Sequence, residues 1–101
     1  MLNLRQQKRK KIYYLETIQE FINEFLNLQT KETTRRNYEI AITKYVEFLN
    51  QETQNQAITE DNAETNIKLY RSYLQKSHRL ASSSIDSYTL RIQAFNSYLG
   101  F

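Results

Sequence analysis

The sequence predicts an all-α fold, a compact bundle of four main helices. Apolar residues recur at steps of three and four along four separate segments, the spacing that places them on one side of an α-helix. Proline is absent and glycine occurs only at Gly100, so the turn residues typical of sheet proteins are missing. A chain of 101 residues is long enough for one domain with one core.

The first helix is expected over residues 13–28. Its inward stripe consists of Leu15, Ile18, Ile22, Phe25 and Leu26. Glu16, Glu20 and Glu24 follow one another at four-residue steps on another side of this helix. We interpret them as a solvated acidic row rather than an acid–base pair, because no partner residue accompanies them.

The second helix is expected over residues 33–50. Its inward stripe consists of Tyr38, Ile42, Tyr45 and Leu49. In the preceding connector Thr30 is the expected N-cap, and Glu32 suits the positive end of the helix.

A polar linker from Asn50 to Ala57 leads to the third helix, which is expected to begin near Thr59 with Glu60 and Asp61 in its first turn. Its inward stripe consists of Ala63, Ile67, Tyr70 and Leu74.

The fourth helix is expected to begin at Ser82 or Ser83, after a polar loop that contains His78. Ser83 and Asp86 have the spacing of a capping box. Its inward stripe consists of Ile85, Tyr88, Ile92, Phe95 and Leu99.

The net charge of +3 is unevenly distributed. Five cations lie in the first 11 residues, namely Arg5, Lys8, Arg9, Lys10 and Lys11. The rest of the chain has 9 basic and 11 acidic residues. We therefore divide the chain into a basic arm, residues 1–12, and a helical domain, residues 13–101. The arm is either a solvated tail or a source of phosphate contacts.

Composition excludes most catalytic and metal chemistry. Cysteine is absent, and a single histidine leaves no pair for a metal site or a proton relay. One glycine excludes a glycine-rich phosphate loop. Four of the eight tyrosines, Tyr38, Tyr45, Tyr70 and Tyr88, fall on the inward stripes and are expected to pack there. We expect no enzyme activity, cofactor or metal, no membrane span, and a place in the cytoplasm of a bacterium or phage host, as the Asn-, Lys- and Ile-rich composition is typical of AT-rich genomes.

The sides of the second and fourth helices away from the core have the residues that bind nucleic acid. The second has Arg36, Asn37 and Lys44, and the fourth has Ser83, Ser87 and Arg91. Arginine, lysine and asparagine contact phosphates and base edges, and serine lets a helix approach a backbone closely. Taken alone, the pattern also fits a solvated face. Ile40 on the same side either contacts a thymine methyl or, as is common in bundles, packs on a neighbouring helix.

The order of residues resembles the core-binding domain of tyrosine recombinases, the phage-integrase family with a SAM-like helical fold. Three elements covering residues 14–99 carry this resemblance. They are Thr34, Tyr38, Ile42, Tyr45, Phe48 and Leu49; Ile58-Thr59 with Tyr70, Tyr73 and Leu74; and Ser84-Ile85 through Tyr98-Leu99. Two departures concern helix starts. The family spacing places the start of the third helix near Thr65, and the family's usual cap of the second helix falls on Lys31.

The resemblance implies a non-catalytic module that positions a recombinase on its core DNA site. In that family this domain and a separate catalytic domain clamp the duplex, and the second and fourth helices face it. The catalytic tyrosine and the His-x-x-Arg motif belong to the catalytic domain, and no His-x-x-Arg occurs here. The chain looks like the isolated amino-terminal domain of a longer integrase, without a preceding arm-site-binding domain. The expected partners are double-stranded DNA, the downstream catalytic domain and other recombinase protomers.

The candidate DNA-contacting residues combine the two helix faces and the arm. They are Arg35, Arg36, Asn37, Lys44, Ser83, Ser87 and Arg91, with Lys10 and Lys11. The alternative function is a protein-interaction bundle in which Ile40 and Leu90 face a partner. A helix-turn-helix regulator fits less well, because the linker after the second helix is long and has no glycine.

Overall fold

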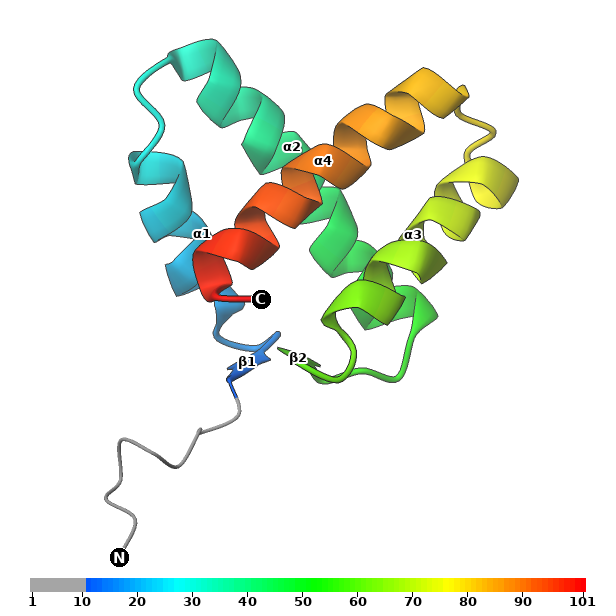
Figure 1. Ribbon diagram of the computed structural model, residues 1–101, viewed down its shortest axis with the longest axis horizontal. Helices are drawn as coiled ribbons and strands as arrows, with labels where there is room; N and C mark the ends of the chain where they lie inside the picture. Colours follow the sequence, from blue (N-terminus) through cyan, green and yellow to red (C-terminus); the bar gives the residue numbers. More distant parts are fainter. Residues whose placement is uncertain (1–10) are drawn as a thin grey trace, which may run out of the picture.

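The computed structural model describes residues 11–101 and confirms the all-α class. Four helices and two short strands occur in this range, in the order β1 (Ile12–Tyr14), α1 (Ile18–Asn27), α2 (Glu32–Glu52), β2 (Ala57–Thr59), α3 (Ala63–Ser77) and α4 (Ser82–Leu99). Helices α2 and α4 cross, with α1 and α3 on either side (Figure 1). Helix α4 packs against each of the other three. No helix among these residues has the length and apolarity that crossing a membrane requires.

The core lies where the four helices meet, and the predicted stripes supply nearly all of it. Ile42, Tyr45 and Leu49 of α2 are fully buried, as are Ile92 and Phe95 of α4. Tyr38 and Tyr88, predicted in the same stripes, are only partly buried at the edge of the core. The period of the apolar residues therefore predicted the correct inward side of each helix.

A two-stranded antiparallel sheet closes one end of the bundle and was not predicted. Strand β1 pairs with β2 in the register Ile12↔Thr59, Tyr13↔Ile58 and Tyr14↔Ala57. The amide of Leu15 continues the pairing by donating to the carbonyl of Gln56 at 2.9 Å. The prediction of a first helix from residue 13 was therefore wrong, because these backbone groups bond across to a distant strand.

The same sheet moves the start of the third helix. Thr59 lies in β2, so it cannot begin α3. The helix begins at Ala63, two residues before Thr65, and Asn62 occupies the N-cap position. The Oδ1 atom of Asn62 accepts the amide of Thr59 at 2.9 Å, and its Nδ2 donates to the carbonyl of Ala57 at 3.0 Å. This side chain fixes the turn between strand and helix. The polar linker is shorter than predicted, because α2 continues to Glu52.

Both predicted caps at the starts of α2 and α4 were wrong. Lys31, not Thr30, is the N-cap of α2, and it makes no side-chain cap bond. Helix α4 begins two residues too early for a Ser83/Asp86 capping box, with Ala81 as its N-cap and no side-chain cap bond. Asp86 instead accepts a hydrogen bond from Arg71 of α3 at 2.9 Å, and the same guanidinium donates to Thr89 Oγ1 at 3.0 Å. Asp86, predicted to be part of a cap, instead joins α4 to α3.

Helix α4 ends in a Schellman turn. Gly100 has a φ of 96°, its amide donates to the carbonyl of Ser97 at 3.0 Å, and the amide of Phe101 donates to the carbonyl of Asn96 at 2.9 Å. The turn brings the ring of Phe101 to within 5.6 Å of the ring of Tyr13.

Candidate nucleic-acid interface

The crossing of α2 and α4 brings residues of the two predicted faces together. The Nζ atom of Lys44 in α2 lies 5.6 Å from the centre of the Tyr88 ring in α4, within cation–π range. Lys44 therefore lies on the flank of α2 next to α4, not directly opposite the core. In Figure 1 the first turns of both helices lie at the top, and the helices converge below them.

Helical spacing places three more predicted residues on the sides that meet at this crossing. Asn37 precedes Lys44 by seven residues, which is close to two full turns, so both lie on the same side of α2. Arg91 follows Tyr88 by three residues and Ser87 by four, so these share one side of α4. We call Asn37, Lys44, Ser87 and Arg91 the crossing face.

The crossing face is open to ligand. Asn37, Lys44 and Ser87 are exposed, and Arg91 is partly buried. Within residues 11–101, no hydrogen bond or ion pair ties Asn37, Ser87 or Arg91 to another side chain. A lysine and an arginine thus lie near a hydroxyl and an amide, a combination suited to phosphate oxygens with limited base contact.

Two other predicted residues, Arg36 and Arg35, point elsewhere, whereas Ser83 precedes Ser87 by four residues on the side of α4 that bears the crossing face. Arg36 is exposed on the outer side of α2, where its Nη2 lies 3.8 Å from a carboxylate oxygen of Glu32. Arg35 faces the connection to α1, with Nη2 donating to the carbonyl of Gln29 at 3.5 Å. Ser83 is exposed in the first turn of α4. These residues border the crossing face but do not complete it.

The basic arm is not joined to the crossing face by any described contact. Lys10 lies outside the described residues. The Nζ atom of Lys11 donates to the carbonyl of Gly100 at 3.4 Å, beyond the end of α4. Ser83 lies 17 residues before Gly100, about 25 Å away along a helix. Lys11 therefore lies at the end of α4 opposite the one that carries the predicted serines.

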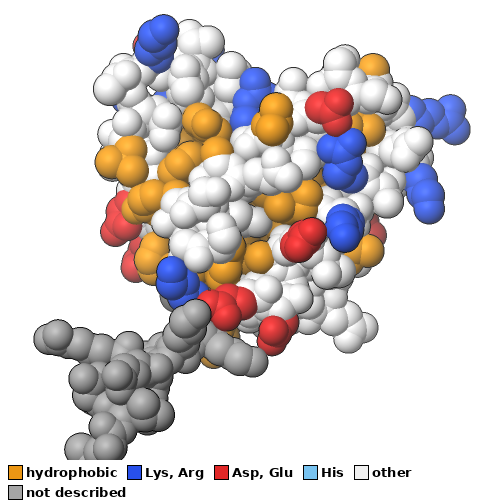
Figure 2. Space-filling model, in the orientation of Figure 1, with side chains coloured by type: hydrophobic (Ala, Val, Ile, Leu, Met, Phe, Trp, Pro, Cys, Tyr) orange, Lys and Arg blue, Asp and Glu red, His pale blue; other side chains and the backbone are white. Residues whose placement is uncertain are grey.

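Apolar side chains remain exposed on the outer sides of both helices. Ile40 is 43 % exposed, so the expectation that it packs on a neighbouring helix of the bundle was wrong, and Leu90 is 66 % exposed. Figure 2 shows Lys and Arg side chains spread over one face of the molecule among acidic and neutral ones. The cations form no continuous patch on this face, so the binding strength expected of it is modest.

No group of three or more His, Asp or Glu residues in the range 11–101 is arranged to hold a metal ion. His78 is exposed and touches only the edge of the Tyr73 ring. Burial raises the pKa of the Tyr45 and Tyr70 hydroxyls well above the ordinary value, so both stay protonated and are poor nucleophiles.

No known family model, curated protein or solved structure matches this chain significantly. The likeness to the recombinase core-binding domain therefore stays a prediction from the residues quoted above.

Sequence reasoning missed the part that Tyr88 plays in this surface. It was assigned to the core stripe, yet its partly buried ring contacts the Lys44 ammonium. Ser84, four residues earlier, lies on the same side and is also partly buried. The weak signal available was position: a tyrosine at the edge of a stripe keeps its ring face free for a cation.

Proposed function

We propose that this chain is a non-catalytic DNA-binding module of a site-specific tyrosine recombinase, and that it positions the enzyme on its core recombination site. The observation that carries the proposal is the contact of Lys44 in α2 with the ring of Tyr88, three residues before Arg91 in α4, beside the crossing of the two helices that the resemblance assigns to the duplex. Phosphate contacts supply most of the affinity, and Asn37 and Arg91 read bases to a limited extent. Strand breakage and rejoining belong to a separate catalytic domain.

The charge of the crossing face sets the expected affinity. Two cations, with contributions from Arg36 and the arm, neutralise three to five phosphates at most. We therefore expect the module alone to bind duplex DNA with a dissociation constant of about 10⁻⁴ to 10⁻⁶ M at physiological salt. A second domain on the opposite side of the duplex raises this affinity in the parent protein.

Binding of a labelled duplex to charge-neutral variants, followed by fluorescence anisotropy at low salt, tests the proposal. We expect Lys44→Gln and Arg91→Gln each to weaken binding several-fold. Lys68→Gln is the matched control, because Lys68 is an exposed lysine of α3 paired only with Glu64 at 3.9 Å. A parent protein that binds no DNA at low ionic strength contradicts the proposal. So do Lys44 and Arg91 variants that bind as well as the Lys68 variant.

A protein-interaction bundle is the second candidate, and the exposure of Leu90 and Ile40 favours it. Under this alternative a Leu90→Lys variant loses self-association or partner binding, whereas DNA causes no shift of the Arg91 amide signal in an NMR titration. Under the DNA-binding proposal the amide signals of Lys44 and Arg91 shift with added duplex, and Leu90→Lys leaves DNA binding intact.

A further inference from the structure

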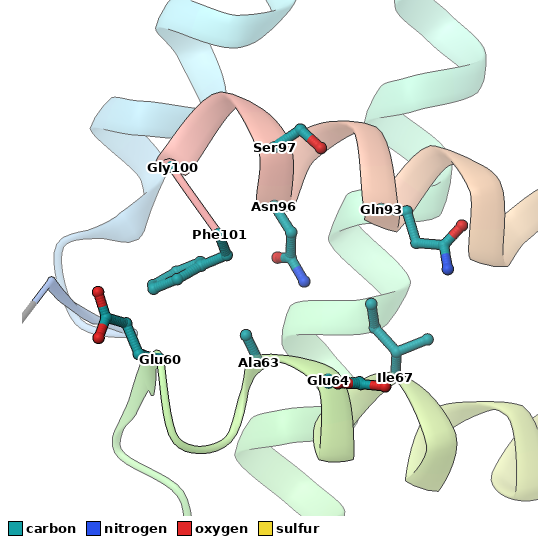
Figure 3. A pocket seen from close by; sticks show the side chains of 9 residues that line it. All are labelled: Glu60, Ala63, Glu64, Ile67, Gln93, Asn96, Ser97, Gly100 and Phe101. Carbon is teal, nitrogen blue, oxygen red and sulfur yellow. The ribbon is translucent and has the colours of Figure 1, made fainter.

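A second polar site lies at the far end of α4, between that end and the start of α3. A pocket with a volume of about 540 Å³ opens there. It is lined by residues of the β2–α3 turn, of the first turns of α3, and of the last turns of α4 with the two residues that follow them. In Figure 3 the side chains of Asn96 and Phe101 project from the end of α4 toward the start of α3, and Glu60 lies opposite them. The crossing face contributes nothing to this pocket.

Asn96 presents an unpaired acceptor at this site. The residue is only 5 % exposed, and its Oδ1 atom has no hydrogen-bond donor among residues 11–101. A buried acceptor without a donor is unfavourable, and nearly all such groups in proteins are paired. Asn96 therefore favours a ligand that brings N–H groups to it.

Both charged residues that line the pocket are negative. Glu60 of the β2–α3 turn and Glu64 of the first turn of α3 line it, and no lysine or arginine does so. Glu64 has a loose ion pair with Lys68, at 3.9 Å between exposed side chains. The carbonyl of Gly100 on the rim already accepts a hydrogen bond from the Lys11 ammonium at 3.4 Å. The site thus combines carboxylates, an amide oxygen and a carbonyl oxygen, all of which accept hydrogen bonds.

Apart from Gln93 and Ser97, the rest of the lining is apolar. Ala63, Ile67 and Phe101 lie beside these acceptors. Apolar surface next to acceptors suits a cation on an alkyl stem, because the methylene groups pack while the charged head bonds. The aromatic ring adds a face that attracts cations.

We propose that this pocket binds a guanidinium or ammonium group on an alkyl stem, that is, the side chain of an arginine or a lysine. Two sources offer this chemistry. One is the basic segment directly before Lys11, which contains Arg5, Lys8, Arg9 and Lys10. The other is a basic peptide of another polypeptide. The inference does not depend on DNA binding, since it uses the opposite end of α4.

An NMR titration of the full chain with N-acetyl-arginine methylamide tests the site. We expect saturable shifts of the Asn96 and Gln93 side-chain amides and of the Phe101 backbone amide, with a dissociation constant on the order of 1 mM. N-acetyl-norleucine methylamide, which has an uncharged stem, is expected to leave these signals unchanged.

Variants separate the role of the carboxylates from a general charge effect. We expect the double variant Glu60→Gln/Glu64→Gln to bind the arginine probe about two- to tenfold more weakly, as expected for the loss of two exposed ion pairs. The double variant Glu39→Gln/Glu52→Gln removes the same charge from exposed positions of α2 outside the pocket, and is expected to bind like the parent.

A chain in which Arg5, Lys8, Arg9 and Lys10 are all changed to Gln distinguishes the two sources. If the chain's own segment fills the pocket, the Asn96 signals differ between parent and variant, and the variant binds the probe more tightly. If the ligand comes from another polypeptide, parent and variant show the same signals and the same affinity. Absence of saturable shifts in both chains overturns the proposal, as does equal binding by the two double variants.

Discussion

Gly100 occupies a backbone conformation that other residues adopt only with strain. Its φ of 96° lies in the left-handed region, and it ends α4 in the Schellman turn that directs Phe101 toward Tyr13. The Lys11 side chain also approaches it closely: a Cβ added at Gly100 would lie 2.0 Å from Lys11 Nζ. The ammonium is the free end of a flexible chain, so the backbone conformation is the more demanding of the two constraints.

We expect Gly100→Ala to lower the free energy of unfolding by about 1 to 2 kcal/mol, measured by urea denaturation. Gly100→Asn is expected to lower it less, because asparagine tolerates positive φ better. The double variant Gly100→Ala/Lys11→Ala separates the two causes. If it recovers the parent's stability, the contact with Lys11 rather than the backbone conformation is responsible.

Tyr45 and Tyr70 are phenols held neutral inside the core. Their exposed fractions are 0 % and 1 %, and burial is the main cause of the upward shift of both pKa values. The pKa of the Tyr98 hydroxyl is also raised, mainly because this hydroxyl donates a hydrogen bond to a carboxylate oxygen of Glu24 at 2.9 Å. In the unfolded chain these groups ionise near the ordinary value of 10.

Stability is expected to be insensitive to these groups below about pH 10 and to fall above it. The sign follows from the raised pKa: the folded state retains its phenolic protons where the unfolded state has already released them, so rising pH favours unfolding. Urea denaturation at a series of pH values measures this. Tyr70→Phe, which removes a buried hydroxyl without a described partner, is expected to match the parent at neutral pH and to lose less stability at alkaline pH. An identical alkaline loss in the variant contradicts the assignment.

Among the structural elements, strand β1 depends on one side chain for its attachment to α4. Tyr13 Oη donates to the carbonyl of Leu99 at 2.6 Å, in a partly buried position. Its ring also packs in a T-shaped arrangement against the rings of Phe21 and Phe101, with 4.9 Å and 5.6 Å between ring centres. Tyr13 thus joins the sheet, α1 and the end of α4.

We expect Tyr13→Phe to lower the free energy of unfolding by about 1 kcal/mol, because the ring contacts remain and one hydrogen bond is lost. Tyr14→Phe is the matched control. The Tyr14 side chain is 56 % exposed, so loss of its hydroxyl is expected to leave the free energy of unfolding unchanged. Equal stability of the two variants in chemical denaturation would show that the bond to Leu99 contributes nothing.

The four helices were predictable and the two strands were not, for a physical reason. A helix is specified by neighbours three and four residues away, so the stripe from Ile85 to Leu99 is visible in the sequence alone. Strands of three residues are too short to show a period, and β1 is defined by pairing with residues 45 or so positions later. The apolar residues of β1 therefore look like the first turn of the helix that follows.

For the molecule as a whole, the salt dependence of DNA binding measures how many cations reach the duplex. We expect the logarithm of affinity to fall with the logarithm of salt concentration at a slope of about −3 to −4. Lys44→Gln is expected to make this slope shallower by about one, because one phosphate contact is lost. Lys68→Gln, on α3, is expected to leave the slope unchanged. Equal slopes for the parent, Lys44→Gln and Lys68→Gln would show that Lys44 makes no phosphate contact.

The candidate site was predictable in its residue types but not in its layout. A helical projection places Lys44 and Arg91 on the sides away from the core, whereas the structure has Lys44 on the flank of α2 next to α4 and Arg91 partly buried. The angle at which α2 and α4 cross depends on packing between residues far apart in sequence, including the packing of both helices on α1: the ring centre of Phe25 lies 5.0 Å from that of Tyr38 in α2 and 5.5 Å from that of Phe95 in α4. The crossing decides that Lys44 meets Tyr88, whereas Lys11 lies beside Gly100 at the other end of α4.

The bond between Tyr13 and Leu99 joins residues 86 positions apart. A ribosome releases the chain from its beginning, so β1 emerges long before its partner in α4 exists. Helices α1 and α2 can form and pair early, since their contacts are near in sequence. Strand β1 can pair with β2 once residues 57–59 have emerged, but Tyr13 has neither its acceptor at Leu99 nor the Phe101 ring until those residues have left the exit tunnel, and during that interval its ring is open to chaperones.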